Sequence, residues 1–215
     1  MTFKRYYPAF LDLVGKHVVV IGGGEVAERK ALSLLECGAY VHIISPELTP
    51  RLEELVATGK ITVERRFYTC GDLRGCFLVI GATNDEDVNH QVFAEAEERR
   101  ILCNIVDAPH LCSFIAPSVI SRGDLQIAIS TNGKSPMLSR RIREHIEAFF
   151  GEEYAGFVNL LGDLREEIQR RFPDEAKRRE VIERLVYSDI PGLIKAGQQS
   201  SVQEIVSRCV SLSSD

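Results

Sequence analysis

The feature that most constrains this chain is a glycine-rich turn that follows a run of β-branched residues near the N-terminus. Residues 18–21 read Val-Val-Val-Ile, which is typical of a buried parallel strand, and residues 22–27 read Gly-Gly-Gly-Glu-Val-Ala. Residues 28–38 then have the apolar spacing of a helix and end on a glycine, and residues 40–44 form a second strand-like run. This order of strand, G-x-G-x-x-A turn, helix and strand predicts a dinucleotide-binding site.

The small residues of the turn have separate physical roles in such a site. Gly22 allows the tight turn, Gly24 lets the backbone approach a pyrophosphate, and Ala27 lets the helix pack closely on the strand. Free N–H groups at the start of the helix attract the phosphates. The alternative is a glycine-rich turn that only packs. The predicted cofactor contacts in this turn are Gly22, Gly23, Gly24, Glu25 and Val26.

The position that usually contacts the ribose departs from the common pattern. An acidic residue is expected about 20 residues further on, at the end of the second strand, where it holds the ribose 2′-OH. Ser45 occupies this place and is followed by Pro46 and Glu47. Either the Glu47 side chain or backbone groups of Ser45 and Pro46 could contact the ribose. The choice between NAD and NADP therefore stays open at this point.

Composition and charge exclude several classes of protein. A chain of 215 residues with 45% hydrophobic and 27% charged residues can bury a sizeable core, and its net charge of −5 argues against general nucleic-acid binding. No apolar run reaches membrane-spanning length, and the N-terminus lacks the pattern of a secretory signal. The six cysteines form no C-x-x-C pair and no zinc-like spacing with histidine. We expect a soluble, cytoplasmic protein without a membrane or nucleic-acid partner and without a bound metal.

The first half of the chain alternates strands and helices at short intervals, which predicts a Rossmann-type, doubly wound parallel α/β sheet over residues 1–112. Ligands of such sheets bind at the carboxyl ends of the strands. Thr83 and Asn84 follow a predicted strand and are therefore candidate cofactor contacts; the alternative is a turn that caps a helix. Beyond the second strand, the predicted elements are a helix at 50–58, strands at 61–65 and 77–82, a helix at 87–99 and a strand at 102–106.

The pattern changes after residue 112. Residues 113–150 are expected to form a small α+β region, and residues 151–215 a helical C-terminal domain with a packing role. In the α+β region, Ser135 suits a helix N-cap and Pro136 the first helical position. The predicted elements of this region are strands at 113–120 and 125–130, a hairpin-like turn at 121–124 and a helix at 137–150.

Five motifs follow one another along the chain: GGGEVAERKALSLLECGA (22–39), GATNDEDVN (81–89), CNIVDAP (103–109), SFIAPSVISRGDLQIAIST (113–131) and GKSPMLSRRIRE (133–144). In these motifs the chain resembles the siroheme synthase family, specifically its precorrin-2 dehydrogenase/sirohydrochlorin ferrochelatase part. The resemblance covers the chain almost end to end, and the order of the motifs is highly specific.

The resemblance implies NAD-dependent oxidation of precorrin-2 to sirohydrochlorin and, as in many members, insertion of ferrous iron. It also implies a homodimer formed through residues 113–150. The uroporphyrinogen methyltransferase domain of fused relatives has no counterpart here, so that activity is not expected. Two alternatives are a dehydrogenase without chelatase activity and a regulatory module that only senses NAD.

The resemblance also assigns site residues. The family's catalytic aspartate falls on Asp107, as a general base, whereas the bare sequence favours a turn aspartate before Pro109. His110 is a candidate for proton relay or substrate contact, and a surface histidine is the alternative. Because the substrate carries many carboxylates, basic residues are expected in the cleft, although charges on a helix often form only a solvated face. The basic candidates are Lys134 and Arg140, with Arg141 and Arg143 beside them.

Overall fold

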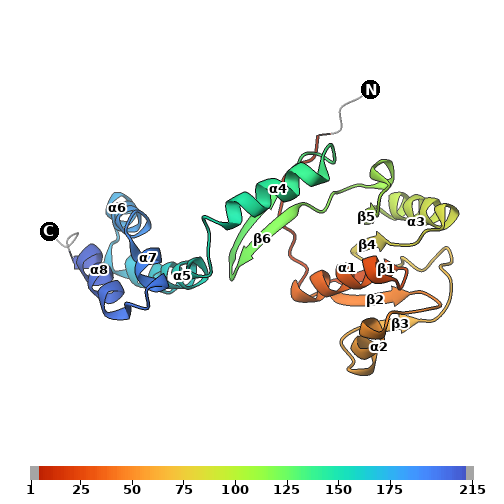
Figure 1. Cartoon of the computed structure of the whole chain (residues 1–215), viewed down its shortest axis with the longest axis horizontal. Coiled ribbons are helices and arrows are strands. Elements are labelled where there is room, and N and C mark those ends of the chain that lie inside the picture. Colours follow the sequence, from red (N-terminus) through yellow and green to blue (C-terminus); the bar gives the residue numbers. More distant parts are fainter. Residues whose placement is uncertain (1–4, 212–215) are drawn as a thin grey trace. The chain divides into compact units, whose positions relative to one another are not determined.

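The computed structural model describes residues 5–211 and divides into two compact units, with the division between Ala116 and Pro117 (Figure 1). Unit 1 precedes the division and unit 2 follows it. The glycine-rich turn belongs to unit 1, and the predicted basic residues of the substrate site belong to unit 2.

Unit 1 is built on a parallel sheet of five strands in the order β3-β2-β1-β4-β5. This order confirms the predicted Rossmann-type, doubly wound fold. The strands are β1 (His17–Ile21), β2 (Tyr40–Ile44), β3 (Thr62–Glu64), β4 (Leu78–Gly81) and β5 (Leu102–Ile105). The helices are α1 (Glu25–Glu36), α2 (Pro50–Ala57), α3 (Glu86–Arg99) and the short 3-10 helix η1 (Pro109–Leu111).

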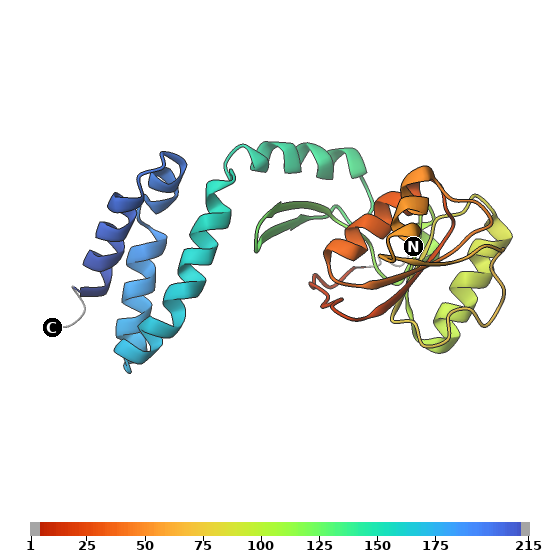
Figure 2. The same cartoon turned by 90° about the horizontal axis from the view of Figure 1, so that it is seen from below.

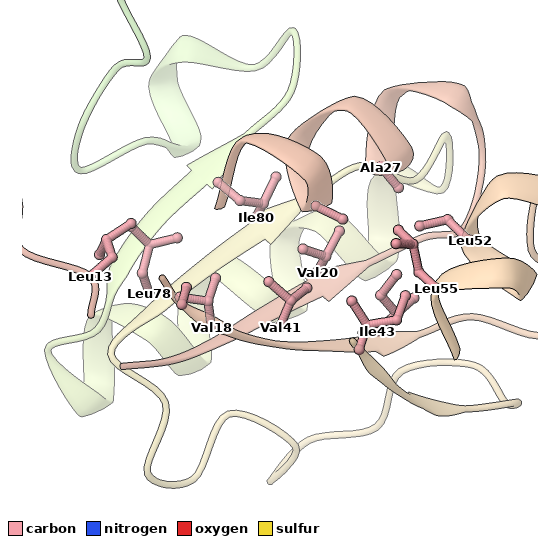
Figure 3. Packing of buried hydrophobic residues seen from close by; sticks show 13 residues of the cluster. Leu13, Val18, Val20, Ala27, Val41, Ile43, Leu52, Leu55, Leu78 and Ile80 are labelled. Atoms are coloured by element: carbon pink, nitrogen blue, oxygen red, sulfur yellow. The ribbon is translucent and has the colours of Figure 1, made fainter. Parts of the chain in front are cut away.

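The sheet is buried on both faces because helices pack against each of them, and successive strand residues point to opposite faces. On β1, Val18 and Val20 belong to the core beneath α1 and α2, whereas Val19 and Ile21 belong to the core beneath α3. Figure 3 shows the first of these cores, in which Val18 lies between Leu78 and Val41. The continuous β-branched run of β1 is therefore explained by burial on both sides of the sheet.

Helix α1 begins at Glu25, three residues before its predicted start. Gly24 is the N-cap residue, and the Glu28 N–H donates to the Gly24 carbonyl at 2.9 Å. The helix thus starts directly at the glycine turn, which leaves the first N–H groups at the carboxyl edge of the sheet.

Two glycines of the turn are required by close backbone approach. Gly22 has φ +115°, and a Cβ atom there would overlap the Ala82 carbonyl. A Cβ atom on Gly23 would overlap the Glu47 carbonyl. Both positions therefore exclude a side chain whether or not a ligand is bound.

Unit 2 consists of a β-hairpin, the helix α4 and four further helices. Its strands are β6 (Ser118–Arg122) and β7 (Leu125–Ile129), and α4 (Pro136–Glu147) packs on them (Figure 2). Ser135 caps α4 through its side chain, as predicted, by accepting from Leu138 N–H at 3.2 Å. The helices α5 (Glu153–Arg171), α6 (Glu175–Val186), α7 (Ile190–Lys195) and α8 (Gln199–Ser211) share a core that includes Phe157, Leu185 and Ile190. Within residues 5–211, no helix is long and apolar enough to cross a membrane.

The first strand of the hairpin starts at Ser118, five residues later than predicted. The Ser113 N–H donates to the Cys103 carbonyl at 2.8 Å, and the Asn104 side chain donates to the Phe114 carbonyl at 3.0 Å. These bonds tie residues 113–114 to β5 in unit 1, so the segment cannot belong to the hairpin. The turn is correspondingly tighter than predicted, because Arg122 pairs with Leu125 and leaves a two-residue loop.

Candidate functional site

A cleft of about 650 Å³ lies at the carboxyl edge of the parallel sheet in unit 1. Its walls are the turns after β1, β2 and β4 and the loop after β3. The structure brings together at this cleft all ten predicted cofactor residues: Gly22, Gly23, Gly24, Glu25, Val26, Ser45, Pro46, Glu47, Thr83 and Asn84. The lining residues that the sequence analysis did not single out are Ile21, Ile44, Leu48, Thr49, Phe67, Tyr68, Ala82, Asp85 and Val88.

The N-terminus of α1 forms an open cradle in this cleft. Gly24 has φ −82° and ψ −175°, and no atom of residues 5–211 outside its own neighbourhood lies within 4 Å of the place where its Cβ atom would be. A ligand can therefore approach the backbone closely here and accept from the N–H groups of the first helical turn. This cradle suits the pyrophosphate of a dinucleotide, which can accept hydrogen bonds from N–H groups at a helix N-terminus.

The turns after β1 and β2 are tied to each other. The Gly22 N–H donates to the Ile44 carbonyl at 3.0 Å, and the Thr49 N–H donates to the Gly23 carbonyl at 3.0 Å. The Ser45 side chain is 7% exposed, and its hydroxyl donates to the Glu47 carbonyl at 2.7 Å. The Ser45 hydroxyl thus stabilises the turn, whereas the Glu47 side chain is exposed to the cleft.

The charges that line the cleft are all negative. Among the lining residues, Glu25, Glu47 and Asp85 are acidic and none is Lys or Arg. The favourable environment for phosphate is therefore the N-terminus of α1, with its partial positive charge.

The turn after β4 both caps α3 and lines the cleft. The Asp85 side chain accepts from the Val88 N–H at 3.1 Å, and the Thr83 hydroxyl oxygen accepts from the Asp85 N–H at 3.2 Å. Asn84 is exposed at the cleft. The capping alternative is thus correct for this turn, and Thr83 and Asn84 also line the cleft.

Phe67 and Tyr68 enter the cleft from the loop that follows β3. The sequence could have indicated both residues as cleft residues. Their loop follows a predicted strand, and the carboxyl ends of parallel strands share one edge of the sheet. Arg66 holds the loop through two bonds to the Asp72 carboxylate, at 2.7 and 2.8 Å. The Tyr68 hydroxyl donates to Glu95 of α3 at 2.5 Å.

Glu95 is a buried carboxylate, 3% exposed, that anchors this loop to α3. Besides Tyr68 it accepts from the Gly71 N–H at 2.8 Å and from Arg99 Nε at 2.7 Å. Burial opposes ionisation of Glu95, but the bonds from Tyr68, Gly71 and Arg99 outweigh it and lower the pKa of the carboxyl below its ordinary value.

We expect Glu95→Gln to reduce the free energy of unfolding at pH 7 by roughly 1.5–3 kcal/mol, since hydrogen bonds to a charged group are lost. Because the pKa of Glu95 is lowered in the folded state, its contribution is present above the ordinary pKa of 4.5 and is lost as the pH falls below it. Urea unfolding at pH 7 and at about pH 3.5 measures both effects, with the exposed Glu97→Gln on the same helix as the control. Equal stability of Glu95→Gln and the unmodified chain at pH 7 would contradict this role.

Asp107 and His110 lie at the same edge of the sheet, one strand beyond the cleft lining. The Val106 N–H donates to the Gly81 carbonyl at 2.9 Å, which places the end of β5 beside the end of β4. Asp107 is exposed and has φ +59°, a left-handed conformation that Asp and Asn adopt more readily than most residues. His110 is exposed on η1, with its ring centroid 6.3 Å from that of His90.

A buried cysteine supports the loop that carries Asp107. The Cys112 Sγ atom lies 3.3 Å from the Ile105 N–H and 3.3 Å from the carbonyl oxygens of Ile105 and Ala108. The Cys112 thiol thus contacts the backbone on both sides of Asp107, at Ile105 and at Ala108.

The predicted basic residues of the substrate site lie in unit 2. Arg140 and Arg143 form ion pairs with Glu144 (2.9 Å) and Glu147 (2.7 Å) on the same helix, as the solvated-face alternative expects. Lys134 is exposed in the turn before α4. Among residues 5–211, no group of three or more His, Cys, Asp or Glu side chains could hold a metal ion.

Three family models match successive parts of the chain. They are described as putative NAD(P)-binding (residues 9–118), sirohaem biosynthesis protein central (122–148) and sirohaem synthase dimerisation region (153–208). The region described as the dimerisation region (153–208) lies outside residues 113–150, for which dimerisation was expected from the sequence.

Similar proteins have been named as siroheme synthases. The chain is 41% identical to siroheme synthase 3 of Aeromonas hydrophila, over 93% of this chain and 43% of the relative, and 40% identical to the siroheme synthase of Photorhabdus laumondii, over 90% and 41%. It therefore spans less than half the length of these relatives. A solved structure described as SirC, precorrin-2 dehydrogenase, superposes with a TM-score of 0.77 at 30% identity, covering 94% of this chain and all of that one.

Proposed function

Because this chain belongs to the siroheme synthase family, we propose that it catalyses the NAD-dependent oxidation of precorrin-2 to sirohydrochlorin. The observation that carries the proposal is the position of Asp107. This exposed carboxylate lies at the carboxyl end of β5, beside β4, and the turn after β4 lines the open cradle at Gly24. A cofactor cleft and a potential base thus share one edge of the sheet, as the reaction requires.

The cleft suggests how the cofactor is held. The N-terminus of α1 binds the pyrophosphate, and Glu47 after β2 accepts from a ribose hydroxyl. The other half of the dinucleotide extends past Thr83 and Asn84, on the side of the sheet nearer Asp107. When bound, NAD supplies the acceptor for the hydride that leaves the substrate.

The chain itself supplies the group that takes the proton. Oxidation removes a hydride and a proton from the macrocycle, and we assign the exposed Asp107 carboxylate as the group that accepts the proton. His110 is the next candidate for proton relay or substrate contact. Lys134 and Arg140 are proposed to bind substrate carboxylates, which would compete with the Glu144 ion pair of Arg140.

The direct test is NADH formation from NAD and precorrin-2, followed by absorbance. Substrate-dependent NADH formation is expected. Binding of NAD without turnover would instead favour a module that senses NAD.

Insertion of ferrous iron into sirohydrochlorin is a second proposed activity, with iron as a substrate. Entry of the metal releases two pyrrole protons, and Asp107 is exposed and able to accept protons. Insertion of iron or cobalt into sirohydrochlorin, with and without Asp107→Asn, separates a bifunctional enzyme from a dehydrogenase alone.

We expect NADP to bind at least about tenfold more weakly than NAD. The 2′-phosphate of NADP would approach Glu47, and the cleft lining offers no Lys or Arg to pair with it. Calorimetric titration with both cofactors measures the difference in affinity. Glu47→Gln should make this difference smaller. Equal affinities would show that the ribose does not lie at Glu47.

We also expect a homodimer. A hairpin of two strands is marginally stable alone, and β6 and β7 each leave an unpaired edge within the described sheet. Apolar side chains of the hairpin and of the helix packed on it are exposed, including Val119 of β6 and Met137 of α4. Light scattering at micromolar concentration should give twice the mass of the chain, and a monomer would contradict the proposal.

A further inference from the structure

Phe67 is an exposed aromatic side chain inside the cleft. It is 73% exposed, whereas its neighbour Tyr68 is 7% exposed. Single exposed apolar residues are ordinary on a protein surface, so exposure alone indicates nothing. What distinguishes Phe67 is its place in a cleft together with a backbone that is fixed on both sides.

The backbone of Phe67 is held by polar contacts of its neighbours. Arg66 donates to the Phe67 carbonyl at 3.0 Å while it also pairs with Asp72. On the other side, Tyr68 is bonded to Glu95. Because these contacts order the loop, the Phe67 backbone has a defined position in the cleft, and a ligand that stacks on the ring loses little free energy to ordering the loop.

The sheet topology determines which part of a dinucleotide would meet this ring. The strand β3 pairs with β2, on the side of β2 away from β1. With the pyrophosphate at α1, after β1, and a ribose at Glu47, after β2, the attached base lies further along the same edge, toward β3. Phe67 follows the end of β3 by three residues.

We propose that Phe67 is the stacking platform for the adenine ring of the dinucleotide. This inference rests on the proposed function, because the nicotinamide must then lie toward β5, where Asp107 can act. Stacking suits both groups: the phenyl ring loses its exposure to water, and adenine presents an apolar face that needs no hydrogen-bond partner.

The test compares three ligands by calorimetry: NAD, ADP-ribose, and nicotinamide mononucleotide, which lacks adenine. Phe67→Ala should weaken the binding of NAD and of ADP-ribose by about 5- to 150-fold, the range of base–aromatic stacking. The affinity for nicotinamide mononucleotide should stay unchanged. The KM for NAD should rise while kcat at saturating NAD stays the same. Phe67→Tyr should retain affinity, because the ring is kept.

The matched control is Phe10→Ala, which removes a phenyl ring that is 68% exposed in unit 1 and does not line the cleft. Thermal melts verify that each variant is folded, and Phe67→Leu replaces Phe67→Ala if the alanine variant is not. Unchanged affinity for NAD and ADP-ribose in the folded variant would overturn the inference, as would a loss confined to the mononucleotide. If either result is found but Gly24→Val loses NAD binding, the Phe67 inference is wrong while the proposed cofactor site is still supported. An unmodified chain that binds none of the three ligands would overturn the proposed function and the inference together.

Discussion

Asp107→Asn is expected to slow the oxidation of precorrin-2 by about 100- to 10,000-fold, the usual cost of losing a positioned base. The amide has the shape of the carboxylate but cannot accept the proton. NAD affinity should stay near that of the unmodified chain, because Asp107 does not line the cofactor cleft. Single-turnover NADH formation at saturating NAD measures the chemical step, and calorimetry measures cofactor binding.

The backbone at this position makes Asn the right replacement. Asp107 has φ +59°, where Asn is tolerated and where Ala or a β-branched residue would add strain. A loss of rate in Asp107→Asn therefore reports on chemistry rather than on a distorted loop. Asp87→Asn, at an exposed aspartate on α3, is the control. Turnover of Asp107→Asn within a few-fold of the unmodified rate would exclude Asp107 as the base. His110 would then be the next candidate for the base.

Gly24→Val is expected to weaken NAD binding by more than about 100-fold, or about 2.8 kcal/mol, without unfolding the chain. The backbone of Gly24 is extended, a conformation that valine adopts readily, and the space beside it is open. The added side chain would occupy the place proposed for the pyrophosphate. Calorimetry with NAD and a thermal melt of the same sample give the two readouts.

Two further glycine variants serve as controls for Gly24→Val. Gly162→Val places the same side chain in open space on α5, outside the cleft, and should leave NAD affinity unchanged. Gly23→Val should instead destabilise the fold, since its side chain would overlap the Glu47 carbonyl. If Gly24→Val binds NAD normally, the pyrophosphate does not lie at the N-terminus of α1.

The alternation of strands and helices in unit 1 was predictable because the information is local. The β-branched run of β1 reflects burial on two faces, and the glycines after it reflect a turn that few other residues can form. Positions that follow strand ends were predictable as cleft residues, since all parallel strands end at one edge of the sheet. For this reason the ten predicted cofactor residues line one cleft, although their contact with NAD is still a proposal.

The geometry of the folded turns and the contacts between separate segments decided the rest. The Ser45 hydroxyl bonds to its own turn, and only the folded turn shows that Glu47 is the residue with a side chain free to reach the cleft. Phe67 lies in the cleft because Tyr68 is bonded to Glu95, 27 positions away in the sequence. The late start of β6 has the same origin, because Ser113 pairs with Cys103 of β5 rather than with the hairpin. Local pattern thus determined the sheet and its ligand-binding edge, whereas the folded turns and the contacts between separate segments determined which side chains reach the cleft.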